Sequence, residues 1–110
     1  MVRRLSASGA DGVVLDLEDA VADSEKLAAR AAAREALPTL TGVLRAVRVN
    51  AFETGLTAGD VAAVVCPELD AIVLPKAETS QDIRRLERLI ARAEAAGGVA
   101  EGSVRGIAIV

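Results

Sequence analysis

Three carboxylates stand at the end of a short apolar run near the start of the chain. Residues 13–17 are almost continuously branched and apolar, which is typical of a strand covered on both faces in a parallel sheet. Asp16, Glu18 and Asp19 fall at or just past the carboxyl end of this strand. Ligands of α/β proteins bind at that end, so the cluster is interpreted as ligand-facing. Any single acid could instead accept hydrogen bonds from loops or cap the next helix.

Further polar residues follow the next two apolar segments, 44–50 and 70–75, and these are Arg48, Asn50, Lys76 and Glu78. Because parallel strands bring their carboxyl ends to one edge of a sheet, we expect all of these side chains at one rim. An arginine there is suited to bind a carboxylate through two parallel hydrogen bonds, and acids are suited to hold Mg2+ directly or through water. The pattern indicates an anionic substrate held on a divalent ion. An ion-pair network that only closes the rim is the alternative.

The segments that must position these residues recur about every 30 residues, which is the pattern of βαβ units. Strands are predicted at residues 13–17, 44–50, 70–75 and 104–110, with a helix in each gap. The Thr57/Asp60 and Thr79/Asp82 pairs have the spacing of capping boxes for the second and third helices. Residues 1–11 are interpreted as the last turns of a helix that ends at Gly9.

Four βα units of this size correspond to part of an eight-unit barrel of about 250 residues. The sequence therefore predicts an α/β fold, with residues 1–110 forming a single domain that is a partial (β/α)8 TIM barrel. A small, complete doubly wound sheet is the alternative, but it would leave the apolar last strand without its helix. The edges of a partial barrel, residues 13–17 or a neighbour and residues 104–110, would be unpaired, which predicts self-association as a homo-oligomer or aggregate.

Composition excludes several classes of function. A net charge of -3 and a single aromatic residue, Phe52, argue against binding of nucleic acid. No apolar run approaches the roughly 20 residues of a membrane helix, and no signal-peptide core follows Met1, so we expect a cytoplasmic protein without a membrane partner. The absence of histidine excludes Ser-His-Asp, Cys-His and histidine-zinc sites built from this chain alone. The lone Cys66 is interpreted as a buried, inert thiol.

Several segments together resemble the citrate lyase beta subunit group of the HpcH/HpaI aldolase family. The resemblance is carried by four segments in matching order and spacing. They are Ala-Asp-Gly-Val-Val-Leu-Asp-Leu-Glu-Asp-Ala-Val at 10–21, Lys26 with Ala29-Arg30, Val-Arg-Val-Asn at 47–50 and Ile-Val-Leu-Pro-Lys-Ala-Glu at 72–78. It implies a TIM barrel that uses Mg2+ to cleave or form a carbon-carbon bond in 3-hydroxyacyl thioesters such as citryl-CoA or malyl-CoA.

The resemblance and the rim pattern assign three groups of site residues: catalytic Asp19 and Glu18, substrate-binding Arg48, Asn50 and Lys76, and cofactor-binding Lys26 and Arg30 near the nucleotide of CoA. Arg48 is expected to bind the substrate carboxylate. The resemblance also implies that an additional first strand precedes this chain. Both metal ligands, a Glu and a later Asp, are expected beyond Val110, so the chain alone is expected to be inactive. A non-catalytic α/β binding or structural domain is the alternative.

Overall fold

One five-stranded sheet forms the centre of the structure, a computed structural model that describes residues 2–7, 10–18 and 23–109. The strands lie in chain order, β1 (Val2–Ala7), β2 (Ala10–Asp16), β3 (Leu44–Arg48), β4 (Ala71–Leu74) and β5 (Arg105–Ala108). β2 to β5 are mutually parallel, which confirms the four strands predicted from the apolar runs.

The interpretation of residues 1–11 as the end of a helix is wrong. Val2–Ala7 is instead a strand that pairs antiparallel with β2, with Leu5 opposite Gly12. The physical reason is that β2 would otherwise expose a row of unpaired backbone groups along its outer side. The pairing satisfies these groups, which outweighs the weak helix preference of this short segment. The two edges of the sheet are therefore β1 and β5, and β2 is internal.

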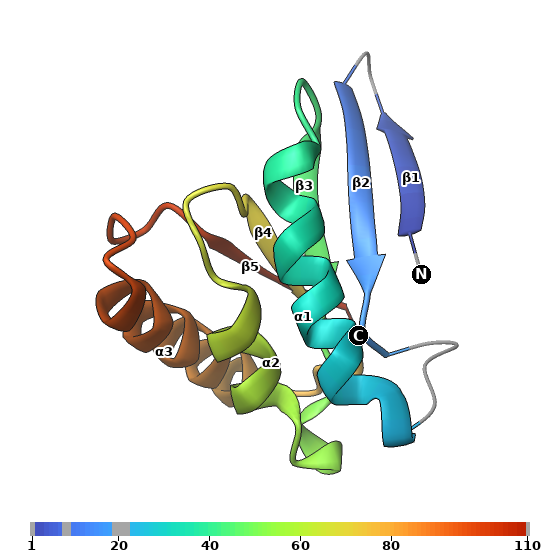
Figure 1. Cartoon of the computed structure of the whole chain (residues 1–110). Coiled ribbons are helices and arrows are strands. Elements are labelled where there is room, and N and C mark those ends of the chain that lie inside the picture. Colours follow the sequence, from blue (N-terminus) through green and yellow to red (C-terminus); the bar gives the residue numbers. More distant parts are fainter. Residues whose placement is uncertain (1, 8–9, 19–22, 110) are drawn as a thin grey trace.

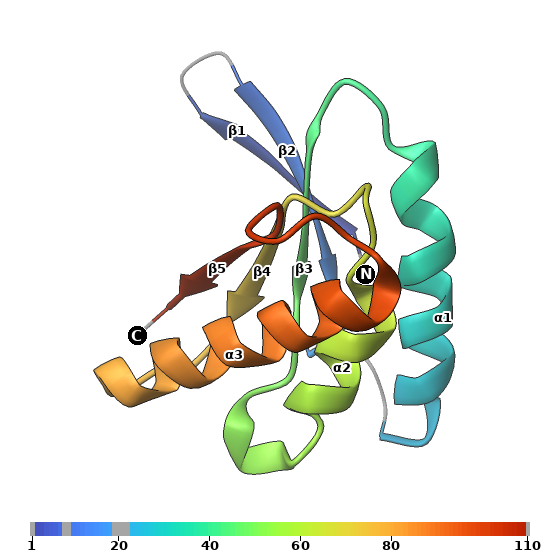
Figure 2. The same cartoon turned by 90° about the vertical axis from the view of Figure 1, so that its left-hand side faces the viewer.

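Each parallel strand except the last is followed by a helix, and all three helices pack on one face of the sheet (Figures 1 and 2). The helices are α1 (Lys26–Ala36), α2 (Thr57–Val64) and α3 (Ser80–Gly97), with short 3-10 turns at Asp23–Glu25, Leu37–Thr39 and Phe52–Thr54. A parallel sheet with sequential βα units and helices on one face is the arrangement of a partial (β/α)8 barrel, so the predicted fold class is confirmed.

The predicted capping box of α3 is confirmed. Thr79 precedes the helix with extended backbone, its Oγ1 accepts from Asp82 N at 3.3 Å, and Thr79 N donates to Asp82 Oδ2 at 3.3 Å. At the other end Gly98 has φ of 67°, the left-handed conformation in which glycine has no steric cost. The capping box and Gly98 thus determine where α3, the longest of the three helices described above, begins and ends.

The two faces of the sheet differ in what covers them. On the helix side lies the main core, whose largest buried members include Leu37, Ile72, Leu74 and Leu86. The opposite face carries a smaller apolar group of Val14, Ala46, Ala71 and Val73. No helix among the described residues packs on that second face (Figure 2). Leu44, Ile107 and Ile109 remain about half exposed there and at the nearby edge, with exposed fractions of 53%, 47% and 49%.

Two smaller expectations can be compared with the structure. Cys66 is a free thiol that is 1% exposed, as predicted. None of the helices in the described part of the chain has the length and apolar content needed to cross a membrane.

Candidate functional site

The carboxyl ends of β2 and β3 bring Asp16 and Arg48 together. The two residues are direct partners in the parallel register of the strands. Arg48 Nε donates to Asp16 Oδ1 at 3.1 Å, and Arg48 Nη2 donates to Asp16 Oδ2, so the guanidinium meets the carboxylate with two parallel hydrogen bonds. The Asp16 side chain is fully buried, whereas that of Arg48 is 17% exposed. The arginine is thus held in one orientation while its charge reaches the rim.

Glu18 lies on the same guanidinium. Its Oε1 atom is 3.7 Å from Arg48 Nε, and its backbone N–H donates to Asp16 Oδ1 at 2.9 Å. The structure therefore brings two of the predicted site residues, Glu18 and Arg48, into contact through Asp16. Asp19 lies outside the described residues.

Asn50 follows β3 and lies below this rim, only 1% exposed. Its Oδ1 accepts from Lys26 Nζ at 2.8 Å, and its Nδ2 donates to Leu17 O at 3.2 Å. Lys26 is also buried, and its Nζ donates to the backbone carbonyls of Leu17 at 3.3 Å and Glu18 at 3.4 Å. Three neutral oxygens thus receive the three N–H groups of the ammonium. In the structure, the polar groups of Asn50 and Lys26 therefore bind each other and the backbone carbonyls that follow β2.

Asp60 of α2 lies under Asn50 and is completely buried. Its Oδ2 accepts from both Asn50 N and Asn50 Nδ2 at 2.8 Å, and its Oδ1 accepts from Arg30 Nε at 2.7 Å. Thr57 Oγ1 donates to Asn50 O at 2.7 Å. The predicted Thr57/Asp60 capping box is therefore wrong, because both side chains bind the end of β3; the residue at the N-cap is Leu56.

Gly59 leaves room for the Arg30 guanidinium beside Asp60. A Cβ atom at Gly59 would lie 2.7 Å from Arg30 Nη2 and 2.9 Å from Nη1, well inside normal contact distance. Arg30 Nη2 also donates to the Leu56 carbonyl at 3.1 Å. A glycine inside a short helix, next to an acid among apolar residues, was the one sequence signal that could have pointed to this contact.

Lys76 leaves β4 at the same end of the sheet but contacts a different partner. Its Nζ lies 3.5 Å from Glu53 Oε1, and both side chains are about two-thirds exposed, 66% and 69%. Its backbone has φ of 57°, the one non-glycine residue in the left-handed region among those described. Such a conformation costs of order 1–3 kcal/mol and is found preferentially at functional sites. The described contacts do not connect Lys76 to Arg48.

A metal ion does not fit the described residues by themselves. No group of three or more His, Cys, Asp or Glu side chains within residues 12–18 and 24–109 is arranged to hold one. Asp16, the most buried acid of the rim, is engaged by Arg48 and by the backbone of Glu18. The described residues of the rim do not form a metal centre alone.

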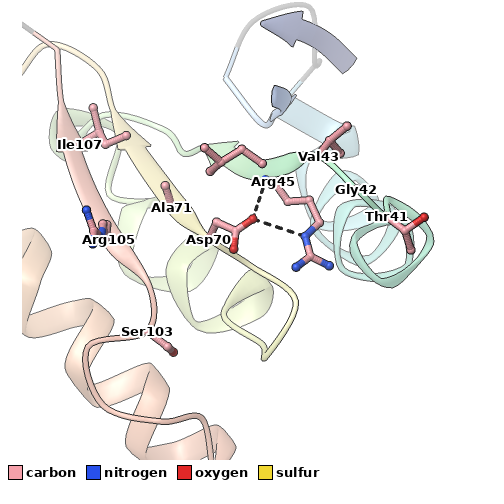
Figure 3. A pocket seen from close by; sticks show the side chains of 10 residues that line it. Thr41, Gly42, Val43, Arg45, Asp70, Ala71, Ser103, Arg105 and Ile107 are labelled. Carbon is pink, nitrogen blue, oxygen red and sulfur yellow. Dashed lines mark hydrogen bonds and ion pairs between the residues drawn. The ribbon is translucent and has the colours of Figure 1, made fainter. Parts of the chain in front are cut away.

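A cavity lies at the opposite end of the strands (Figure 3). It has a volume of about 1000 Å³ and is lined by residues near the amino ends of β3, β4 and β5. Arg45 donates to Asp70 Oδ2 twice, from its backbone N at 2.8 Å and from Nε at 3.4 Å, and these contacts border the cavity. Its size does not make it the functional site, because ligands of parallel α/β folds bind at the carboxyl ends.

Together these features define an α/β protein of the partial-barrel type with an arginine–carboxylate pair at the carboxyl ends of its strands. The model of the HpcH/HpaI aldolase/citrate lyase family matches residues 1–110, so the chain belongs to that family.

Individual relatives agree with this assignment. The chain is 38% identical to the citrate lyase subunit beta of Leuconostoc mesenteroides subsp. cremoris over 112 positions, which cover 100% of this chain and 37% of the relative. It is 41% identical to the citrate lyase subunit beta of Escherichia coli K12, over 86% of this chain and 32% of the relative. A (3S)-malyl-CoA thioesterase of Cereibacter sphaeroides is 40% identical over 74% of this chain and 29% of its own length. The chain thus spans about a third of the length of these relatives.

Proposed function

We propose that the chain forms the substrate-binding part of a Mg2+-dependent carbon-carbon lyase that acts on a 3-hydroxyacyl-CoA thioester such as citryl-CoA or malyl-CoA. Membership of the family and the names of the relatives, citrate lyase subunit beta and malyl-CoA thioesterase, support this class of reaction and substrate. One observation carries the proposal: Arg48 is fixed by Asp16 at the carboxyl end of β3 with part of its side chain exposed.

In this proposal Arg48 binds the free carboxylate of the substrate, and Glu18 and Asp19 act beside the reacting carbons. Cleavage breaks the bond between carbons 2 and 3 of the thioester: the 3-hydroxyl gives its proton to one of these carboxylates as the carbonyl forms, and the electron pair passes to the thioester as an enolate. A proton returned to carbon 2 then completes the product thioester. Asn50 and Lys76 complete the substrate-binding side, and Lys26 and Arg30 remain the residues proposed near the CoA nucleotide.

The proposed Mg2+ ligands lie beyond Val110, and no step above is assigned to the metal because the described residues do not form its site. We accordingly expect the 110 residues alone to bind substrate but not to turn it over. The chain is proposed to be a single partial-barrel domain of a cytoplasmic homo-oligomer. If the gene downstream of the Val110 codon encodes no strand end with a Glu followed later by an Asp, this part of the proposal is wrong.

The second candidate is a non-catalytic binding or structural domain, in which the rim ion pairs only stabilise the fold. The Asp16–Arg48 pair favours it, because this pair already satisfies a buried carboxylate without any ligand. Calorimetric titration with malyl-CoA and acetyl-CoA, with and without Mg2+, separates the two. If the chain is part of a lyase, malyl-CoA should bind more tightly than acetyl-CoA, which lacks the free carboxylate. If the chain is a structural domain, neither thioester should release or absorb heat.

The titration has a matched pair of variants, Arg48→Lys at the carboxyl end of β3 and the control Arg45→Lys near its amino end. Arg48→Lys keeps the charge but removes the fork that binds a carboxylate with two hydrogen bonds, so it should abolish the preference for malyl-CoA. Arg45→Lys makes the same chemical change beside Asp70 and should leave the preference intact. Protein concentration must be measured by peptide absorbance, since the chain contains no Trp or Tyr.

A further inference from the structure

A buried polar network joins four elements directly beneath the substrate rim. Its members come from the end of β2, from α1, from the end of β3 and from α2. They are Leu17, Glu18, Lys26, Arg30, Asn50, Thr57 and Asp60. Every buried side-chain polar atom in the described residues has a hydrogen-bond partner, so the network is fully satisfied. Networks of this kind specify one arrangement of the groups they hold.

Asp60 is the centre of this network. Among the described residues, it is the carboxylate that connects the network's two cations, directly for Arg30 and through the Asn50 amide for Lys26. The chemistry fixes the orientation of that amide, since its oxygen must face the ammonium and its nitrogen must face the carboxylate. Asp60 therefore determines which way Asn50 points, and Asn50 determines where Lys26 can donate.

Lys26 connects Asn50 to the rim through its hydrogen bonds. It binds the carbonyls of Leu17 and Glu18, the two residues that follow the last residue of β2, Asp16. Their positions in turn decide where the Glu18 carboxylate stands against Arg48 Nε. On the β3 side Asp60 holds the backbone N–H of Asn50, two residues beyond Arg48. Both strand ends that carry the rim are thus tied to one buried carboxylate.

We propose that Asp60 is a positioning residue for substrate recognition, which acts through Asn50 and Lys26 to set the geometry of Arg48 and Glu18 at the rim. This inference rests on the proposed function for the identity of the ligand. In this proposal Lys26 and Arg30 also influence the geometry of the rim through their hydrogen bonds within the protein, in addition to any contact they make with CoA.

The test compares Asp60→Asn with Asp70→Asn in the whole chain. Each aspartate accepts one backbone N–H and one arginine Nε–H, but Asp60 also accepts from Asn50 Nδ2 and is completely buried. Asp70 stands at the amino end of the strands, and its side chain is 39% exposed (Figure 3). In Asp60→Asn the affinity for malyl-CoA should fall by about tenfold or more, toward that for acetyl-CoA, which should change by no more than about twofold. Asp70→Asn should leave both affinities within about twofold of the parent values.

A second readout does not depend on ligand. In NMR spectra the Arg48 Nε–H signal should shift and exchange faster with solvent in Asp60→Asn and remain unchanged in Asp70→Asn. If the parent chain binds neither thioester, the proposed function fails, while this signal still decides whether Asp60 positions Arg48. If Asp60→Asn does not fold, Lys26→Gln replaces it with the Arg48 Nε–H signal as the readout, since Lys26 connects Asn50 to the carbonyls of Leu17 and Glu18.

Three results would overturn the inference. Equal losses for malyl-CoA and acetyl-CoA would mean that the network acts on the nucleotide and not on the carboxylate site. An unchanged affinity in a folded Asp60→Asn would mean that the network is structural only. An unchanged Arg48 Nε–H signal in the folded variant, or in Lys26→Gln where that variant is used, would show that the network around Asp60 does not control the rim.

Discussion

Glu94 offers a direct test of how a buried carboxylate supports the connection between α3 and β5. The residue is 2% exposed, and it binds neutral groups of the loop that follows the helix. Its Oε1 accepts from Gly102 N at 3.1 Å and its Oε2 accepts from Val104 N at 3.0 Å. The Ser103 hydroxyl at 3.5 Å is at the limit of hydrogen bonding and contributes little. The loop is therefore fixed by two bonds to one charged group.

Glu94→Gln preserves the size of this side chain but replaces one oxygen with an NH2 group. One backbone N–H then faces a donor and stays unsatisfied, which costs about 1–3 kcal/mol, and the remaining bond loses its charge assistance, which costs about 1 kcal/mol more. The sum is about 2–4 kcal/mol. With ordinary values for a domain of this size, we expect the urea midpoint to fall by about 2 M and the melting temperature by roughly 10–20 °C.

Circular dichroism during urea and thermal unfolding measures this change, because the helices dominate the signal and no Trp or Tyr is available for fluorescence. Glu87→Gln is the matched control, since Glu87 is an exposed residue of the same helix and its replacement should cost less than about 0.5 kcal/mol. A Glu94→Gln chain that unfolds at the same midpoint as Glu87→Gln would refute the reasoning, because it would show that the loop does not depend on the carboxylate.

Three further predictions concern the rim, the packing of α2 and the assembly of the chain. Arg48→Ala should weaken malyl-CoA binding by about 2–5 kcal/mol, because both the buried Asp16 carboxylate and the substrate carboxylate lose the guanidinium as an ion-pair partner. An affinity that calorimetry finds unchanged would remove Arg48 from the site. Gly59→Ala should destabilise the fold by about 1 kcal/mol, since the loss of the Arg30–Asp60 bond exceeds the gain in helix propensity; a higher urea midpoint would contradict this. Sedimentation at micromolar concentration should show self-association through the exposed edges and apolar face, and one sharp monomeric boundary with cooperative unfolding would contradict it.

The parallel strands and the longest helix were predictable because their signals are local. Apolar runs bounded by turns mark β2 to β5, and Thr79 with Asp82 forms its capping box from residues three positions apart. The strand Val2–Ala7 was not predictable in this way, since it exists through pairing with a neighbour and not through its own pattern. Secondary structure that depends on a partner strand leaves a weak signal in a short segment.

The site shows the same division between local and distant causes. That Arg48 and Glu18 meet at the rim follows from the parallel register of strands whose positions the sequence indicates. Thr57 and Asp60 have the same spacing as the pair that caps α3, yet their side chains bind Asn50. The difference arises because Asn50 is buried beside α2, and the sequence gives no information about that proximity.

The left-handed backbone of Lys76 has a consequence for any attempt to stabilise this protein. Glycine adopts φ of 57° without steric cost, so replacing Lys76 with glycine would relieve local strain of order 1–3 kcal/mol. A redesign guided by stability alone would therefore choose this position early. It would at the same time delete the positive charge where the chain leaves β4, so thermostability and the proposed substrate binding by Lys76 would be opposing selection criteria at this residue.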